Sequence, residues 1–132
     1  IDLFNGGHHQ RDFTYIDDIV QGVVACVDHT ATADPRWDSD APNPAASRAP
    51  YKIYNIGNQK PVPLLRYIEV LERCLGRHAQ KNLLPMQAGD VPDTWADVEL
   101  LAQEVGYRPS TDLETGVQRF VEWYLAYYHS QP

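Results

Sequence analysis

An arginine stands between an extended stretch and an acidic helix start, in the run from Arg11 to Ile19. Its planar guanidinium carries a permanent charge and a fork of N–H donors, so arginine suits phosphate recognition better than lysine does. The chain has a formal net charge of −7, which makes a positive group held at this junction worth explaining. The alternative is an ion pair of Arg11 with Asp12 or Asp17 and no further role.

A second polar cluster extends from Met86 to Val91 and follows a predicted strand. Gly89 would let the backbone approach a ligand closely, and the Asp90 carboxylate could accept hydrogen bonds from vicinal hydroxyls such as those of a ribose. The alternative is an ordinary loop turn. Arg11 and Asp90 together supply a phosphate donor and a hydroxyl acceptor, a combination that can hold a sugar nucleotide.

Other reactive combinations are weaker. His8 and His9 are adjacent, so their side chains point apart, and no histidine or glutamate at helical spacing completes a metal site. We therefore predict no metal and no catalytic residue in this chain. The sequence contains no nucleophile elbow, no P-loop and no glycine-rich dinucleotide fingerprint, so we do not expect it to bind NAD in the Rossmann manner by itself.

The amino-acid composition excludes some classes of binding partner and indicates the cellular compartment. The negative charge argues against nucleic acid, which needs a basic face, and no apolar run is long enough to span a bilayer. Cys26 and Cys74 lie in helical patterns without a dense cysteine framework, which is typical of reduced core thiols in a cytosolic protein. The chain opens on Ile1 in a predicted strand and without Met, which suggests a piece of a longer protein.

The spacing of apolar residues predicts four helices and three or four short strands. The strands are expected over 1–5, 11–14, 51–56 and 82–85. The helical stripes run from Ile16 to Val27, Leu64 to Leu75, Val98 to Val105 and Leu113 to Tyr128. The fold class is therefore α/β, a single domain over 1–132 with few short strands and no complete Rossmann sheet.

The helix ends carry their own signals. Thr14, Asp97 and Thr111 are the predicted N-caps, and Gly76 and Gly106 are predicted to end the second and third helices. Asp17 and Asp18 are expected to serve as first-turn charges rather than catalytic groups. The proline-rich stretch 29–50 has no periodicity and is predicted to be a long surface loop.

Several of these segments occur together, in one order, in a known family. They are Phe4-Asn5-x-Gly7, Arg11 to Ile19, Tyr54 to Asn58, Gln87 to Val91, and Gly106-Tyr107-x-Pro109-x-Thr111. In order and spacing they resemble the C-terminal part of extended short-chain dehydrogenase/reductases that act on nucleotide sugars, above all the UDP-glucuronate 4-epimerases. The resemblance covers essentially the whole chain.

The resemblance implies a role for each candidate site residue. Arg11 occupies the position of the family arginine that binds the substrate diphosphate, and Asp90 that of the acid that contacts the uridine ribose. Gln87 stands where galactose-type 4-epimerases carry an arginine, and this departure favours the uronate branch. Asn55 and the residues around His8 and His9 are expected close to the site.

The same resemblance also implies what the chain lacks. The family's glycine-rich NAD loop and Tyr-x-x-x-Lys catalytic pair belong to an N-terminal Rossmann domain, and here no Tyr stands four places before a Lys. The implied protein is a cytoplasmic, NAD-dependent epimerase that interconverts UDP-glucuronate and UDP-galacturonate and forms a homodimer. This portion would bind the UDP-sugar, pack on its own N-terminal domain, leave apolar surface uncovered without it, and be inert alone.

Alternative functions remain open at this point. A decarboxylase, a dehydratase or another 4-epimerase of nucleotide sugars would carry a similar substrate domain. A non-catalytic module that binds sugar nucleotides, or a purely structural domain, is an alternative from a different class.

Overall fold

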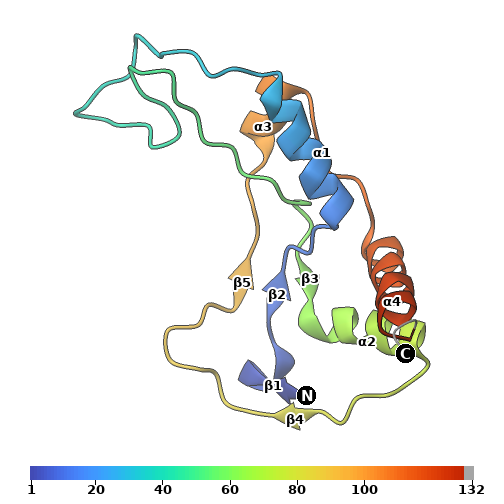
Figure 1. Cartoon of the computed structure of the whole chain (residues 1–132). Coiled ribbons are helices and arrows are strands. Elements are labelled where there is room, and N and C mark those ends of the chain that lie inside the picture. Colours follow the sequence, from blue (N-terminus) through green and yellow to red (C-terminus); the bar gives the residue numbers. More distant parts are fainter. Residues whose placement is uncertain (130–132) are drawn as a thin grey trace.

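The computed structural model describes residues 1–129, in which three short strands occupy the middle of an elongated molecule and two more lie at one end (Figure 1). Helices α2 and α4 lie together on one side, and α1 and α3 lie at the end away from β1 and β4. The elements in chain order are β1 (Asp2–Leu3), the 3-10 helix η1 (Phe4–Gly7), β2 (Gln10–Arg11), α1 (Ile16–Val27), β3 (Val62–Pro63), α2 (Leu64–Leu75), β4 (Asn82–Leu83), β5 (Asp93–Thr94), α3 (Glu99–Val105) and α4 (Leu113–His129).

Strand β2 is the centre of the larger sheet, whose order is β3-β2-β5. It pairs antiparallel with β3 and parallel with β5, so Arg11 lies opposite Val62 on one side and Thr94 on the other. Strands β1 and β4 form a second, parallel pair. The predicted α/β class, with four helices and a few short strands but no Rossmann sheet among residues 1–129, is confirmed.

Helices α2 and α4 enclose the main apolar core. Val70 of α2 is fully buried and packs with Val117 and Val121 of α4, and Tyr67, Leu71, Cys74 and Leu113 surround them. The predicted stop at Gly76 is confirmed, because its φ of 64° is left-handed and its N–H donates back to Arg73 O. The apolar periodicity of the two helices therefore leads to burial where they face each other, while Phe120, Tyr124 and Tyr128 of the α4 stripe remain exposed.

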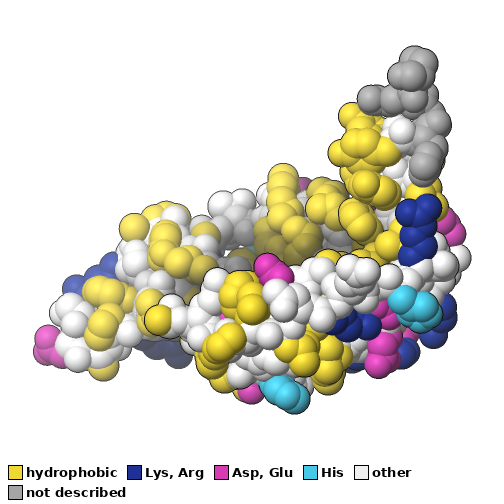
Figure 2. Space-filling model, turned by 90° about the horizontal axis from the view of Figure 1, so that it is seen from below, with side chains coloured by type: hydrophobic (Ala, Val, Ile, Leu, Met, Phe, Trp, Pro, Cys, Tyr) yellow, Lys and Arg dark blue, Asp and Glu magenta, His cyan; other side chains and the backbone are white. Residues whose placement is uncertain are grey.

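Helix α1 forms where it was predicted, but its apolar stripe faces outward. The side chains that are more than half exposed are Ile16, Val20, Val23, Val24 and Val27. The residues that α1 buries are Asp18 and Gly22. Figure 2, which views the molecule from below, shows apolar side chains in several separate groups among polar ones.

Asp18 attaches α1 to the rest of the chain. Its Oδ2 accepts hydrogen bonds from the backbone N–H groups of Ser110 at 3.2 Å and Thr111 at 2.9 Å. The Tyr107 hydroxyl donates to the Asp18 carbonyl at 2.7 Å. The expectation that Asp18 acts only as a first-turn charge is therefore incomplete, since this carboxylate satisfies backbone donors of a distant segment.

Two of the predicted N-caps are displaced. Tyr15, not Thr14, precedes α1, and no side chain caps that helix end. At α4 the Asp112 Oδ1 accepts the Thr115 N–H at 2.8 Å, so the capping position is one residue later than Thr111. Asp97 does accept the N–H of Glu99, the first residue of α3, at 3.0 Å, although Val98 is the residue directly before the helix.

The predicted strand over 51–56 is wrong. The segment has strand-forming residues, but it is not paired as a strand within residues 1–129, and only an isolated bridge joins Lys52 to Ala46. A strand needs a partner, and propensity alone does not supply one. Conversely, β3 and β5 were not predicted, because each is two residues long and exists through its pairing with β2.

The stretch between α1 and β3 contains neither a helix nor a paired strand, which confirms the long loop expected over 29–50. In Figure 1 it extends beyond α1 and α3. None of the helices within residues 1–129 is long and apolar enough to cross a membrane.

Candidate functional site

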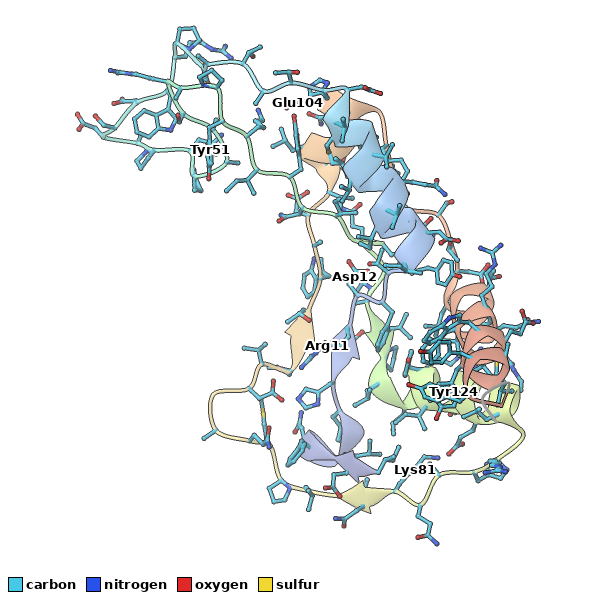
Figure 3. The ribbon with its side chains drawn as sticks, in the orientation of Figure 1. Arg11, Asp12, Tyr51, Lys81, Glu104 and Tyr124 are labelled. Carbon is cyan, nitrogen blue, oxygen red and sulfur yellow. The ribbon has the colours of Figure 1, made fainter. Side chains whose placement is uncertain are left out.

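The Arg11 guanidinium is fixed by the segment that follows Gly89. Nη1 donates to Pro92 O at 2.8 Å and to Gln10 O at 2.9 Å. Nη2 donates to Val91 O at 3.0 Å and lies 3.4 Å from Asp90 Oδ1. In Figure 3 the residue sits on β2 at the centre of the molecule. Its carboxylate partner among the described residues is thus Asp90, rather than Asp12 or Asp17.

Asp12 is occupied elsewhere. Its Oδ1 accepts the Asn58 N–H at 3.1 Å, and its Oδ2 accepts the N–H groups of Gln59 at 3.0 Å and Ala96 at 3.2 Å. Successive side chains of an extended chain point to opposite faces, which separates Asp12 from the guanidinium before it. The tight approach of Gly57 is part of this arrangement, since a Cβ there would lie 2.7 Å from Asp12 Oδ2. Asp12 therefore holds three segments together.

Asp90 follows a turn that requires glycine. Gly89 has a φ of 83°, and nothing lies within 4 Å of the position its Cβ would take, so the residue serves backbone conformation rather than close approach within this chain. Asp90 Oδ1 also accepts the Val91 N–H at 2.8 Å. The side chain is 30% exposed. Its carboxylate thus remains accessible while being oriented by its own turn.

His9 reaches the same carboxylate from the opposite side. Its Nε2 lies 3.1 Å from Asp90 Oδ2, and the residue is only 5% exposed. The sequence pointed to the neighbourhood of His8 and His9 but not to this contact. The sequence spacing could have predicted it. Residues two apart on an extended segment share a face, and His9 precedes Arg11 by two.

An open cavity of about 400 Å³ lies beside Arg11. Asn55 is part of its wall, and its Nδ2 donates to Asp97 O at 3.2 Å. The lining also includes the side chains of Thr14, Thr94 and Trp95. Trp95, which is 62% exposed, was not predicted as a site residue. The cavity brings Arg11 and Asn55 together, although they are far apart in sequence.

Gln87 lies in the same turn as Asp90, and neither residue lines this cavity. Its carbonyl accepts the Asp90 N–H at 3.2 Å, and its side chain is exposed. The structure thus brings Arg11, Asp90 and His9 into contact, places Asn55 nearby, and leaves Gln87 at the surface of the turn.

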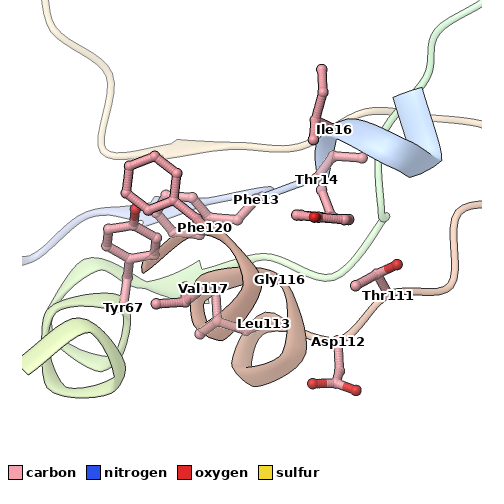
Figure 4. Close-up of a pocket in the computed structure, with 11 residues that line it drawn as sticks. Phe13, Thr14, Ile16, Tyr67, Thr111, Asp112, Leu113, Gly116, Val117 and Phe120 are labelled. Carbon is pink, nitrogen blue, oxygen red and sulfur yellow. The ribbon is translucent and has the colours of Figure 1, made fainter. Parts of the chain in front are cut away.

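A second cavity, of about 230 Å³, has a different character (Figure 4). It is lined mainly by rings and aliphatic groups, among them Phe13, Tyr67 and Phe120, and the Phe13 and Tyr67 rings are stacked at 4.2 Å. Its charged lining residue is Asp112, which caps α4. A cavity without a cationic group does not suit a diphosphate.

The groups with large pKa shifts lie away from Arg11. Burial, followed by the hydrogen bond to Glu104, raises the pKa of Tyr54 to about 12. The Lys81 ammonium, the Ala79 N–H and His78 lower the pKa of Glu72 to about 2. The Tyr54–Glu104 pair and the cluster around Glu72 each join separate segments of the chain, so we assign both a structural role. Within residues 1–129 no three His, Cys, Asp or Glu side chains gather as a metal site.

Comparison with known proteins identifies relatives of this chain. No protein-family model matches the chain. The protein CapI of Staphylococcus aureus is 45% identical over 128 residues, which are 97% of this chain and 38% of CapI. A probable UDP-glucuronate 4-epimerase of Rhizobium meliloti is 42% identical over 125 residues, 94% of this chain and 37% of that protein. The chain is homologous to one segment of the UDP-glucuronate 4-epimerase-like proteins.

The solved structure of a UDP-glucuronate 4-epimerase agrees. The Bacillus cereus enzyme in complex with NAD superposes with a TM-score of 0.70 at 26% identity, over 99% of this chain and 34% of the enzyme. Its complex with UDP-glucuronic acid and NAD gives a TM-score of 0.67. The chain therefore spans between 34% and 38% of the length of these epimerase-like relatives.

Proposed function

We propose that this chain is the UDP-sugar-binding portion of an NAD-dependent UDP-glucuronate 4-epimerase. The observation that carries the proposal is the Arg11–Asp90 pair, 3.4 Å apart, in a chain homologous to these epimerases. A related Bacillus cereus epimerase is described in complex with UDP-glucuronic acid and NAD. A guanidinium can hold a diphosphate and a carboxylate beside it can accept the ribose hydroxyls, so the two side chains can serve adjacent parts of one nucleotide.

Arg11 would exchange its present partners for the diphosphate. Three of its contacts are to neutral carbonyl oxygens, those of Gln10, Val91 and Pro92. A hydrogen bond between two charged groups is roughly twice as strong as one between neutral groups, so a diphosphate competes well for the same donors. Asp90, partly exposed, would accept the ribose hydroxyls. Asn55 and Gln87 would offer amide groups toward the remainder of the ligand.

NAD does not fit this chain itself. The described residues contain no doubly wound sheet, and the sequence has no glycine-rich loop to cradle a dinucleotide. We therefore assign the cofactor and the catalytic Tyr-x-x-x-Lys to a part of the protein outside this chain. The role of the residues described here is to bind and orient the nucleotide, which keeps the reacting sugar in place without gripping its ring. On its own the chain is expected to be inert.

The exposed apolar face of α1 supports the proposal that a further domain packs on this chain. Val20, Val23 and Val24 are each more than half exposed, and the strand-forming segment 51–56 is unpaired in the described chain. An uncovered aliphatic face beside an unpaired extended segment suits a further α/β layer. We propose that the NAD-binding domain expected from the resemblance covers it. The homodimer expected from the same resemblance stays a prediction.

Replacing Arg11 tests the proposal. In the intact protein, Arg11→Ala is expected to weaken UDP-glucuronate binding by about 1.5–3 kcal/mol, the range for a hydrogen bond to a charged group. Isothermal titration calorimetry measures the affinity. Arg36→Ala is the matched control, since Arg36 is 93% exposed in the long loop. Unchanged affinity of Arg11→Ala at low salt would reject the phosphate role.

Product analysis then defines the reaction. The intact protein is expected to convert UDP-glucuronate into its C4 epimer. Decarboxylation or dehydration would instead give products altered at C5 or C6, and binding without turnover would indicate a non-catalytic module. Nuclear magnetic resonance of the sugar product distinguishes these outcomes.

A further inference from the structure

His9 is a buried polar residue whose role the proposed function does not explain. Only 5% of the residue is exposed. Its Nε2 faces Asp90 Oδ2 at 3.1 Å, but the direction is poor for a hydrogen bond, and this nitrogen has no well-directed partner within residues 1–129. Buried polar atoms are usually satisfied, so an imidazole nitrogen left facing a carboxylate needs a reason.

The backbone on both sides of His9 is fixed. The His9 carbonyl accepts the Leu64 N–H at 2.8 Å, and the next residue, Gln10, donates its N–H to Pro92 O at 2.9 Å. The imidazole is therefore presented from a rigid position. Asp90, by contrast, belongs to a glycine turn and is 30% exposed. Of the two partners, the carboxylate is the one that can adjust.

Asp90 lies between two groups that compete for it. Arg11 Nη2 is 3.4 Å from Oδ1, and His9 Nε2 is 3.1 Å from Oδ2. As long as Arg11 holds Asp90, the guanidinium is not free for a ligand phosphate. When Arg11 turns to a diphosphate, Asp90 loses that contact and needs another to stay in place.

We propose that His9 is a positioning residue for Asp90, and that it holds the carboxylate toward the ribose hydroxyls once Arg11 engages the diphosphate. This inference rests on the proposed function. It assigns His9 to recognition of the ribose hydroxyls, not to the phosphates and not to the chemistry at the sugar. Its neighbour His8, which is exposed, has no such role.

The test compares UDP, 2′,3′-dideoxy-UDP and inorganic pyrophosphate as probes, by calorimetry on the intact protein. His9→Leu keeps the bulk but removes Nε2, and it is expected to weaken UDP binding about tenfold, the scale of one hydrogen bond to a charged group. The ratio of UDP to dideoxy-UDP affinity should fall to that of Asp90→Asn. Pyrophosphate affinity should stay within about twofold of wild type, because Arg11 is untouched.

Two further variants separate positioning from folding. His9→Gln retains a side-chain N–H donor and is expected to recover most of the discrimination between UDP and dideoxy-UDP. His8→Leu is the matched control and should behave as wild type. A loss of affinity for all three probes together, not recovered by His9→Gln, would mean a structural role and overturn the inference.

The inference and the proposed function fail in different ways. If Arg11→Ala and Asp90→Asn weaken UDP binding while His9→Leu keeps the wild-type ratio, the positioning role is rejected and the proposed function stands. If neither Arg11→Ala nor Asp90→Asn weakens UDP binding, both are rejected.

Discussion

Helices α2 and α4 share a buried valine core, although the aromatic residues of α4 from Phe120 to Tyr128 stay exposed, whereas α1 exposes nearly its whole stripe. Its attachment is polar, through Asp18 and Tyr107. In the first pair Val70, Val117 and Val121 are almost fully buried. In α1 the buried side chain is that of Asp18, and valines such as Val24 lie in solvent. Both regions have helical apolar periodicity, so the pattern alone does not reveal which stripe finds a partner within the chain.

The difference separates a helix pair that has a core of its own from a helix that has none within the described chain. The α2–α4 pair supplies its own core, and burial of that core stabilises it. Helix α1 and the unpaired segment 51–56 have the composition of buried elements without the burial. Their sequence fits a larger assembly, in agreement with a chain that spans just over a third of its relatives.

Removing the Asp18 carboxylate should have the largest effect on stability. Asp18→Ala leaves the backbone N–H groups of Ser110 and Thr111 without their acceptor and weakens the attachment of α1, which then depends on the Tyr107 hydroxyl bond to the Asp18 carbonyl. We expect a loss of about 3 kcal/mol in the free energy of unfolding, since each bond to a charged acceptor contributes about 1.5–3 kcal/mol and the two are not additive. Urea unfolding followed by circular dichroism measures it.

Asp18→Asn is the control for this variant. It keeps one acceptor oxygen of similar shape, so its expected loss is smaller, about 1 kcal/mol. Equal stability of the alanine variant and the wild type would mean that α1 does not depend on this attachment.

The same substitution in the two regions sharpens the comparison. Val70→Ala deletes two carbons from a fully buried site, and at about 0.8 kcal/mol per carbon plus a cavity contribution we expect a loss of about 2 kcal/mol. Val24→Ala, at a position that is 58% exposed, should change the stability of the 132-residue chain by less than about 0.5 kcal/mol.

In the intact protein the Val24→Ala loss should rise to about 1–2 kcal/mol if the proposed partner domain buries that face. Urea unfolding of both proteins gives the two values. An effect of Val24→Ala that is equally small in the intact protein would contradict a covered α1.

The smallest effect concerns acid stability near the α2–α4 pair. Lys81, with Ala79 and His78, lowers the pKa of Glu72 to about 2. Because the folded-state pKa lies below the unfolded value of about 4.3, the stabilisation is present above pH 4.3 and is lost as the pH falls toward 2. Glu72→Gln should therefore unfold with a shallower dependence on pH in this window, as thermal melts between the two pH values can measure.

The sequence predicted the elements whose signals are local. The apolar spacing of α2 and the left-handed Gly76 lie within one stretch, and the prediction was correct there. The strand at 51–56 failed because pairing depends on a partner that propensity cannot specify, and β5 was missed because its two residues, Asp93 and Thr94, are a strand only beside β2.

The candidate site was predictable to a similar extent. Arg11 and Asp90 were singled out as parts of one ligand site, and they lie 3.4 Å apart. The contact of His9 with Asp90 was not predicted, although the two-residue spacing to Arg11 indicated a shared face. Gln87 was placed with the others by resemblance; like Asp90 it lies outside the cavity beside Arg11, but unlike Asp90 it has no contact with Arg11 among the described residues.

The parallel pairing of β2 with β5 has a consequence for how the molecule folds. It joins Arg11 to Thr94, and the whole of α1, the long loop and α2 lie in the intervening chain. Closing so long a loop costs conformational entropy before the native contacts can stabilise it. Native pairs distant in sequence therefore form slowly. Refolding should therefore restore the α2 and α4 helices early, while the pairing of Arg11 with Thr94, and with it the proposed nucleotide site, returns only in the final phase.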